Sequence, residues 1–265
     1  MYWDTHMHCH FSGDSTADPE AMILAAVQKK LDGVCFTDHI DWDYPGPTPF
    51  SFDPAAYWKE LSTLREKYRE QLSVHIGVEL GLQPHLKEPY ETFTKSWPFD
   101  QVIASSHVVH GFDPYYPEFY EGKTEAEAYL EYFESILENL AVFEDFDVYG
   151  HIDYVVRYGP SKNLNYSYQK YQDVIDEILR TLIAKGKGIE INMAGFKYGL
   201  SHPNPAEDIL KRYRELGGEI LTTGADAHRP EHVAYDYTKL SGILKAAGFT
   251  HYTVFKNRKP VFYPV

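Results

Sequence analysis

Short apolar runs alternate with stretches of helical periodicity along most of the chain. Eight apolar runs have the length of strands, and apolar residues recur at the spacing of a helix in most of the segments between them. The predicted strands are residues 2–8, 33–37, 73–80, 100–105, 147–150, 188–192, 219–223 and 251–255. The pattern therefore predicts a strand–helix unit repeated about seven times, followed by one late strand.

Several helix boundaries can be predicted from local signals. Thr124 and Glu127 have the spacing of a capping box, and an apolar stripe of helical period follows them. A second such stripe stops at Gly186. Three more helices are predicted to begin with a side-chain cap before a proline, at Asp18-Pro19, Asp53-Pro54 and Asn204-Pro205. Gly33 and Gly217 follow two of these helices, as expected of C-terminal glycines.

The alternation of strands and helices favours a parallel sheet. An open doubly wound sheet and a closed barrel both fit, but no glycine-rich nucleotide fingerprint follows the first strand, which removes one reason to prefer the open sheet. No linker or low-complexity stretch divides the chain, so we expect one domain over residues 1–265. The longest irregular segments, 41–52 and 107–122, follow strand ends, where active-site loops of α/β folds lie.

Composition narrows the function classes. Of the 265 residues, 43% are hydrophobic, and no apolar run approaches the roughly 20 residues that span a bilayer, so we expect no membrane association. Only two cysteines and no basic-then-apolar leader point to the cytoplasm. A net charge of -14 repels phosphate backbones, which disfavours nucleic acid as a partner but leaves a small anionic substrate open. The sequence leaves the oligomeric state and the pH optimum open.

The 13 histidines are the unusual feature of the composition, and many of them stand with carboxylates at predicted strand ends. His6 and His8 are two residues apart on the first strand, so they share one face about 6.6 Å apart. The following strands deliver His39, Glu79, His107, His151, Asn192, and Asp226 with His228 near their carboxyl ends. In a β/α barrel these ends form one rim around one cavity, so the convergence predicts a metal site.

Each residue also has a structural interpretation when it is taken singly. A buried Glu79 is costly unless it is neutralised, paired or metal-bound, and metal binding is favoured over an ion pair. Any one of the histidines is about as consistent with a hydrogen-bonded structural role, and only the set favours metal. Asp38 is alternatively a group that supports a neighbouring imidazole. Cys9 and Cys35 are expected to be buried free thiols.

Mixed histidine and carboxylate ligands suit zinc, iron or manganese and do not distinguish them. The nine candidate ligands are His6, His8, Asp14, His39, Glu79, His107, His151, Asp226 and His228. They are too many for one tetrahedral ion, so we expect two or three divalent ions that share bridging ligands. Such centres favour attack by a metal-bound hydroxide on phosphorus or on a carbonyl carbon.

The strand-end motifs, taken in order, resemble those of the polymerase and histidinol phosphatase (PHP) family. The motifs are Asp4-Thr5-His6-Met7-His8, Thr37-Asp38-His39, Gly77-Val78-Glu79, Ser106-His107, Gly150-His151-Ile152-Asp153 and Asp226-Ala227-His228. The resemblance covers nearly the whole chain and is greatest to the members that hydrolyse histidinol phosphate, a late step of histidine biosynthesis. It implies a distorted, TIM-like (β/α)7 barrel, which agrees with the repeat count.

The resemblance also implies roles for individual residues. It assigns three metal positions: His6, His8, Glu79 and Asp226; Glu79, His107 and His151; and His39, His228 and Asp14. Arg157, Lys197 and Asn192 would bind the substrate, with the two basic residues at its phosphate. Lys197 stands where related phosphatases have arginine, so a point charge replaces a bidentate fork. A hydroxide bridging two metals would attack phosphorus, and either Asp226 or a metal-bound water would protonate the leaving group.

Three alternative interpretations remain open. One is a phosphoesterase of the same family that acts on another small phosphorylated metabolite or a nucleotide. A second is an amidohydrolase-like deacylase, although no strand end clearly offers the metal-bridging lysine that such barrels often carry. The least favoured is a non-catalytic module that holds metal or binds a partner, because nothing in the chain looks like an appended domain.

Overall fold

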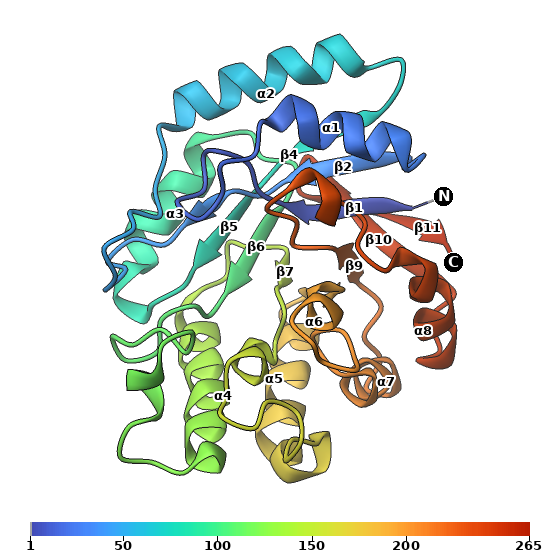
Figure 1. Cartoon of the computed structure of the whole chain (residues 1–265). Helices are drawn as coiled ribbons and strands as arrows, with labels where there is room; N and C mark the ends of the chain where they lie inside the picture. Colours follow the sequence, from blue (N-terminus) through green and yellow to red (C-terminus); the bar gives the residue numbers. More distant parts are fainter. Residues whose placement is uncertain (1) are drawn as a thin grey trace.

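Parallel strands form the centre of the molecule, and helices pack around them (Figure 1). The computed structural model describes residues 2–265. The central strands are β1 (Trp3–Met7), β2 (Gly33–Phe36), β3 (His39–Ile40), β4 (Ser73–Ile76), β5 (Val78–Gly81), β6 (Val102–Ser105), β7 (Val148–Tyr149), β8 (Gly188–Asn192) and β9 (Leu221–Gly224). Almost every residue of these strands is buried, which explains their continuous apolar runs.

The strands close into a barrel of seven. Hydrogen bonding orders them as β1-β2-β4 and β3-β5-β6-β7-β8-β9, and the two sheets are joined because the chain runs from β2 into β3 and from β4 into β5. The remaining seam is closed where Met7 pairs with Ala227 and the His8 N–H donates to the Ala227 carbonyl at 2.8 Å. With β2/β3 and β4/β5 each counted as one strand, the predicted (β/α)7 barrel is confirmed.

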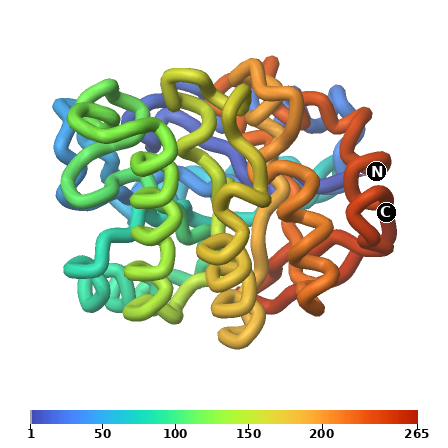
Figure 2. The backbone as a smooth tube through the Cα atoms, turned by 90° about the horizontal axis from the view of Figure 1, so that it is seen from below, coloured from blue at the N-terminus to red at the C-terminus, as the bar shows by residue number. Residues whose placement is uncertain are grey.

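At least one helix follows each barrel strand. The helices are α1 (Pro19–Gln28), α2 (Pro54–Tyr68), α3 (Lys87–Ser96), α4 (Glu125–Val142), α5 (Gln172–Ala184), α6 (Ala194–Lys197), α7 (Glu207–Glu215) and α8 (Leu240–Ala246). Figure 2 shows α4, α5 and α7 side by side along one side of the barrel. The main core lies between the barrel and these helices. Within residues 2–265, no helix has both the length and the apolar character that a membrane crossing requires.

Most of the predicted helix boundaries are confirmed. The side chains of Asp18 and Asp53 accept hydrogen bonds from the first turns of α1 and α2, each with a proline in that turn. Thr124 and Glu127 form the full capping box of α4. Beyond α7, Gly217 has a φ of 96°, a conformation that glycine adopts without steric cost.

Two of the predicted boundaries are wrong. Helix α7 begins at Glu207 rather than at the Asn204-Pro205 cap, because the Asn204 side chain is hydrogen-bonded to the Arg157 guanidinium instead. Gly33 does not end α1 but begins β2, where a Cβ atom would lie 2.4 Å from the Trp3 ring. That glycine serves the close packing of two neighbouring strands.

Two predicted strands also differ from the structure. The strand expected over residues 73–80 is interrupted at Gly77, because β4 pairs with β2 whereas β5 pairs with β3 and β6. The expected single late strand is a hairpin, in which β10 (His251–Lys256) pairs antiparallel with β11 (Lys259–Pro264). The sequence analysis missed β11 because this strand contains Pro260 and Pro264. Proline has no backbone N–H to donate to a neighbouring strand, so its presence argues against a strand.

The hairpin covers the amino-terminal end of the barrel, opposite the strand ends that carry the histidines. Its turn is tied to two aspartates, Asp100 and Asp147, which lie two residues and one residue before the starts of β6 and β7. The Arg258 Nε donates to Asp147 Oδ2 at 2.6 Å, and the Asn257 backbone N–H donates to Asp100 Oδ1 at 3.0 Å. Burial raises the pKa of Asp147, and the charge of Arg258 offsets part of that rise.

Replacing Arg258 by alanine is expected to destabilise the barrel without touching the histidine end. The Arg258→Ala variant leaves the largely buried Asp147 without its charged donor, so the free energy of unfolding should fall by about 1–3 kcal/mol. Urea unfolding followed by circular dichroism measures the change. The exposed neighbour Lys259→Ala is the control, and equal stability of the two variants would contradict the assigned role of Arg258.

Candidate metal centre

Histidine and carboxylate side chains from around the barrel converge at the carboxyl ends of its strands. Four sets of three place their ligand atoms within 4.8 Å of one another: His8, His39 and His228; His6, Glu79 and His151; His6, His8 and Asp226; and His39, Glu79 and His107. Asp14, from the loop after β1, joins the first set. The structure thus brings together all nine residues that the sequence nominated as ligands.

Glu79, on β5, lies at the centre of this cluster and is fully buried. Five imidazoles approach its two oxygens. Oε2 lies near His6 (2.9 Å), His39 (3.3 Å) and His8 (3.4 Å), and Oε1 lies near His151 (2.9 Å) and His107 (3.3 Å). Burial alone would raise the pKa of Glu79, but the imidazoles outweigh it and hold this pKa well below its usual value. The carboxylate is therefore anionic and faces two groups of ligands at once.

The group around Oε2 has the spacing of a metal site. His6 Nε2 and His8 Nε2 are only 3.0 Å apart, and Asp226 Oδ1 lies 3.5 Å from His8 Nε2 and 3.9 Å from His6 Nε2. Ligands about 2.0–2.1 Å from a tetrahedral zinc ion are about 3.3 Å from one another, which is close to these separations. Imidazole and carboxylate donors are also the types that such an ion prefers, so the residues present fit a divalent metal.

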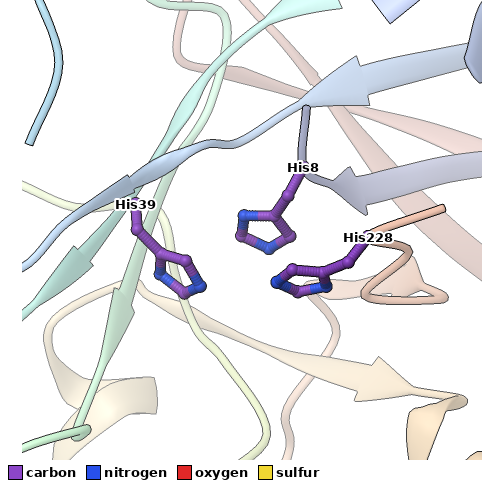
Figure 3. Close-up of side chains that lie close together, drawn as sticks. All are labelled: His8, His39 and His228. Carbon is purple, nitrogen blue, oxygen red and sulfur yellow. The ribbon is translucent and has the colours of Figure 1, made fainter. Parts of the chain in front are cut away.

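A third group lies at the outer side of the cluster, and Figure 3 shows its three imidazoles side by side, with His39 and His228 flanking His8. The His8 ring stacks on those of His39 and His228, with centroids 4.2 and 4.1 Å apart. Asp14 Oδ2 is 3.0 Å from His228 Nε2 and 3.9 Å from His39 Nε2. Burial would raise the pKa of Asp14, but these two imidazoles hold it well below its usual value.

Two further carboxylates orient the imidazoles, and the sequence analysis did not single them out. Glu190 Oε1 bonds to His6 Nδ1 at 2.7 Å, and Asp41 Oδ2 bonds to His107 Nδ1 at 2.8 Å. Acceptors on the far ring nitrogen fix the orientation of metal-ligating histidines. Gly224 allows this approach, because a Cβ there would lie 2.2 Å from Glu190 Oε1. Glu190 could have been predicted from the sequence, because it is a carboxylate inside an apolar strand, as Glu79 is. Asp41 could not be predicted in this way, because it stands at the start of an irregular segment.

Asp38 supports an imidazole, as its alternative interpretation expects, but it acts through a serine. The Ser12 hydroxyl donates to Asp38 Oδ1 at 2.9 Å and lies 3.0 Å from His8 Nδ1. Since the serine hydrogen is committed to the carboxylate, its oxygen accepts the Nδ1–H of His8. The lone pair on His8 Nε2 is consequently left facing the cluster. Cys9 and Cys35 are buried free thiols, as expected.

The basic residues nominated for phosphate lie beside Asp226. Arg157 is almost fully buried, and its guanidinium donates to Asp226 Oδ2 at 2.9 Å and to Asn192 Oδ1 at 3.0 Å. Lys197 Nζ donates to the backbone carbonyl of Asp226 at 2.9 Å. Burial would raise the pKa of Asp226, but His6, His8 and Arg157 hold it well below its usual value. Asp226 is thus an anionic acceptor in this arrangement.

A cleft opens over the cluster, and Arg157 is part of its wall. Aromatic and acidic side chains form much of the remaining wall: Tyr44, Phe50, Asp113, Tyr154, Tyr158 and Tyr198. The Tyr44 hydroxyl donates to Asp113 Oδ2 at 2.7 Å and so joins the two irregular segments 41–52 and 107–122. Both segments border the cleft, as their positions after strand ends led us to expect. The arrangement suits a small ligand whose anionic group would meet Arg157 and the cations that the cluster could hold.

Comparisons with known proteins agree with this geometry. The PHP domain family model matches residues 4–194. The histidinol-phosphatase of Lactococcus lactis subsp. lactis (strain IL1403) is 34% identical over 260 residues, covering 97% of this chain and 95% of the relative. A probable histidinol-phosphatase of Clostridium acetobutylicum is also 34% identical, covering 99% of this chain and 97% of the relative.

Among solved structures, the crystal structure of histidinol phosphate phosphatase from Lactococcus lactis, complexed with zinc, L-histidinol and phosphate, superposes with a TM-score of 0.91. The two chains are 33% identical, and the superposition covers 98% of each. Together with the family model, which spans most of the barrel, these full-length matches show that the chain belongs to the PHP domain family.

Proposed function

We propose that this protein is a metal-dependent phosphate-monoester hydrolase that converts L-histidinol phosphate and water to L-histidinol and phosphate. The observation that carries the proposal is the buried cluster of histidines and carboxylates beside Arg157 at the carboxyl end of the barrel. Support for the substrate comes from the Lactococcus lactis enzyme, which has nearly the same fold and was crystallised with L-histidinol and phosphate. A small phosphorylated partner and a cytoplasmic location are part of the proposal.

The proposed cofactor is a set of two or three divalent ions, with zinc as the first metal to test because the Lactococcus lactis structure contains it. Glu79 would be shared, with His6, His8 and Asp226 on one side and His107 and His151 on the other. His39, His228 and Asp14 would hold a third ion. Such ions lower the pKa of a water that attacks phosphorus, and they neutralise charge on the phosphoryl oxygens.

The protein's own groups would bind and orient the phosphate. A guanidinium has five N–H donors. In Arg157, Asn204, Asp226 and Asn192 each accept from a different nitrogen, so N–H groups of this side chain remain for phosphoryl oxygens at the cleft wall. The ammonium of Lys197 adds positive charge next to Asp226. The proposal gives Asp226 the roles of a metal ligand and of an acceptor for Arg157, and either Asp226 or a metal-bound water would protonate the leaving group.

Metal content tests the proposed role of Glu79. Wild-type protein loaded with zinc and freed of excess metal should retain more than one ion per chain, measured by inductively coupled plasma mass spectrometry. The Glu79→Gln variant should retain at least one ion fewer, since a neutral amide offers one acceptor oxygen where the carboxylate offers two anionic ones. Glu134→Gln, on the exposed side of α4, is the control. Unchanged metal content in Glu79→Gln would refute the shared position.

Phosphate release tests the substrate and the role of Arg157. The zinc-loaded protein should hydrolyse L-histidinol phosphate with a kcat/KM of about 10⁴ M⁻¹s⁻¹ or more, well above its values for nucleotides, sugar phosphates and p-nitrophenyl phosphate. Arg157→Lys should lower kcat/KM by about 100-fold, because a point charge replaces an oriented fork of donors. Slow and unselective release by the wild type would reject histidinol phosphate and direct the search to other phosphoesters.

A further inference from the structure

The side chain of Arg157 is held by acceptors from three separate segments, one of which has no contact with the metal ligands. Nη1 donates to Asp226 Oδ2 and Nη2 to Asn192 Oδ1, while Nε donates to Asn204 Oδ1 at 2.8 Å. All three acceptor side chains are buried. Asn204 lies before α7, where the sequence had predicted a helix cap, so neither its local role nor the metal centre explains it.

The orientation of the Asn204 amide is set by a buried carboxylate on its other side. Asn204 Nδ2 donates to Asp153 Oδ1 at 2.6 Å. The second oxygen of Asp153 accepts the Ala206 backbone N–H at 2.9 Å and the Tyr166 hydroxyl at 3.2 Å. A carboxylate only accepts and a guanidinium only donates, so an amide between them has to turn its nitrogen to Asp153 and its oxygen to Arg157.

The backbone fixes the position of this amide as well. The N–H and carbonyl of Asn204 each exchange a 2.8 Å hydrogen bond with those of Asn192. Asn192 is the residue whose side chain accepts from Nη2, beside Nε on the guanidinium. The two asparagines therefore form a rigid pair that receives Nε and Nη2 of Arg157, and the plane of the guanidinium is defined before any ligand enters the cleft.

We propose that Asn204 is a positioning residue for Arg157 and that Asp153 holds the Asn204 amide in the orientation that Arg157 requires. This rests on the proposed function, in which Arg157 binds the phosphate. Asn204 is hydrogen-bonded to none of the nine candidate metal ligands, and Arg157 is the residue of the cleft wall through which it acts. Without its oxygen, a buried Nε–H is left unpaired and the guanidinium is no longer held in one plane.

Two variants separate positioning from a general loss of structure. Asn204→Ala removes the acceptor from Arg157. Asp153→Asn keeps the shape of the side chain but leaves it only one acceptor oxygen. When this oxygen accepts the Ala206 N–H, the new amide nitrogen faces the Nδ2 of Asn204. Two donors then oppose each other, so the Asn204 amide is driven to turn over. Its Nδ2 would then face the Nε–H of Arg157, donor against donor. Asn163→Ala is the matched control, since Asn163 bonds Ser201 Oγ in the segment just before Asn204 and has no bond to Arg157.

The decisive measurement is a double-mutant cycle with Arg157→Ala, read in kcat/KM for L-histidinol phosphate on zinc-loaded protein. A hydrogen bond to a charged group corresponds to about a 10- to 100-fold loss, which we expect for Asn204→Ala and for Asp153→Asn. In the Arg157→Ala background the same changes should alter kcat/KM by less than about 3-fold, because the group through which they act is gone. Metal content and melting temperature are measured for every variant.

Inorganic phosphate binding, measured by calorimetry on the zinc-loaded variants, keeps the test independent of the substrate. If the wild type binds phosphate but fails to hydrolyse L-histidinol phosphate, the proposed substrate is wrong, and the cycle in phosphate affinity still decides the role of Asn204. Losses that add fully to that of Arg157→Ala would overturn the positioning role. A normal phosphate affinity and normal turnover in both Asn204→Ala and Asp153→Asn would overturn it too.

Discussion

The buried negative charge of Glu79 is the constraint on which the carboxyl end of the barrel depends. A carboxylate without exposure to water is costly unless it is compensated, and five imidazoles compensate this one. Those imidazoles are themselves buried, so their outer nitrogens need partners, and Glu190 and Asp41 supply two of them. Each buried charge is thus compensated by the next group outward from Glu79. Divalent cations bound at the centre of the cluster would compensate the same negative charge.

The barrel makes this cluster possible because the carboxyl ends of all its parallel strands lie at the same end of the barrel. Closure between β1 and β9 brings His6 next to Asp226, which are far apart in sequence, and the Asp226 N–H donates to the His6 carbonyl at 2.9 Å. Asp226 links the histidine cluster to the proposed phosphate-binding arginine, because one of its oxygens faces the imidazoles and the other accepts from Arg157. The hairpin at the opposite end stabilises the barrel without entering the site. Stability and chemistry are therefore located at opposite ends of the same strands.

The sequence predicted the residues whose chemical type suits a metal site and whose position relative to a strand indicates where they lie. Most of the nine ligand candidates lie within or just after buried parallel strands, whose carboxyl ends meet at one rim, so these candidates and the barrel could be anticipated from local pattern and family resemblance. Glu190 was within reach of the same argument. Asp41 and Asn204 were not, because their roles arise from partners more than 40 residues away, His107 and Arg157. Asn204 even carried a misleading local signal, since a tertiary hydrogen bond overrode its capping preference.

The measurement that tests the account most directly is a crystal structure of the metal-loaded protein with phosphate, using anomalous scattering to locate the ions. If Glu79 is shared between two ions, separate peaks should appear on its two sides, about 2.0–2.2 Å from Oε1 and from Oε2 if the metal is zinc, with phosphate oxygens against Arg157. A structure in which no metal contacts Glu79 and phosphate lies elsewhere would contradict it. The cluster would then be a network of buried ion pairs, and the proposed hydrolase would lose its centre.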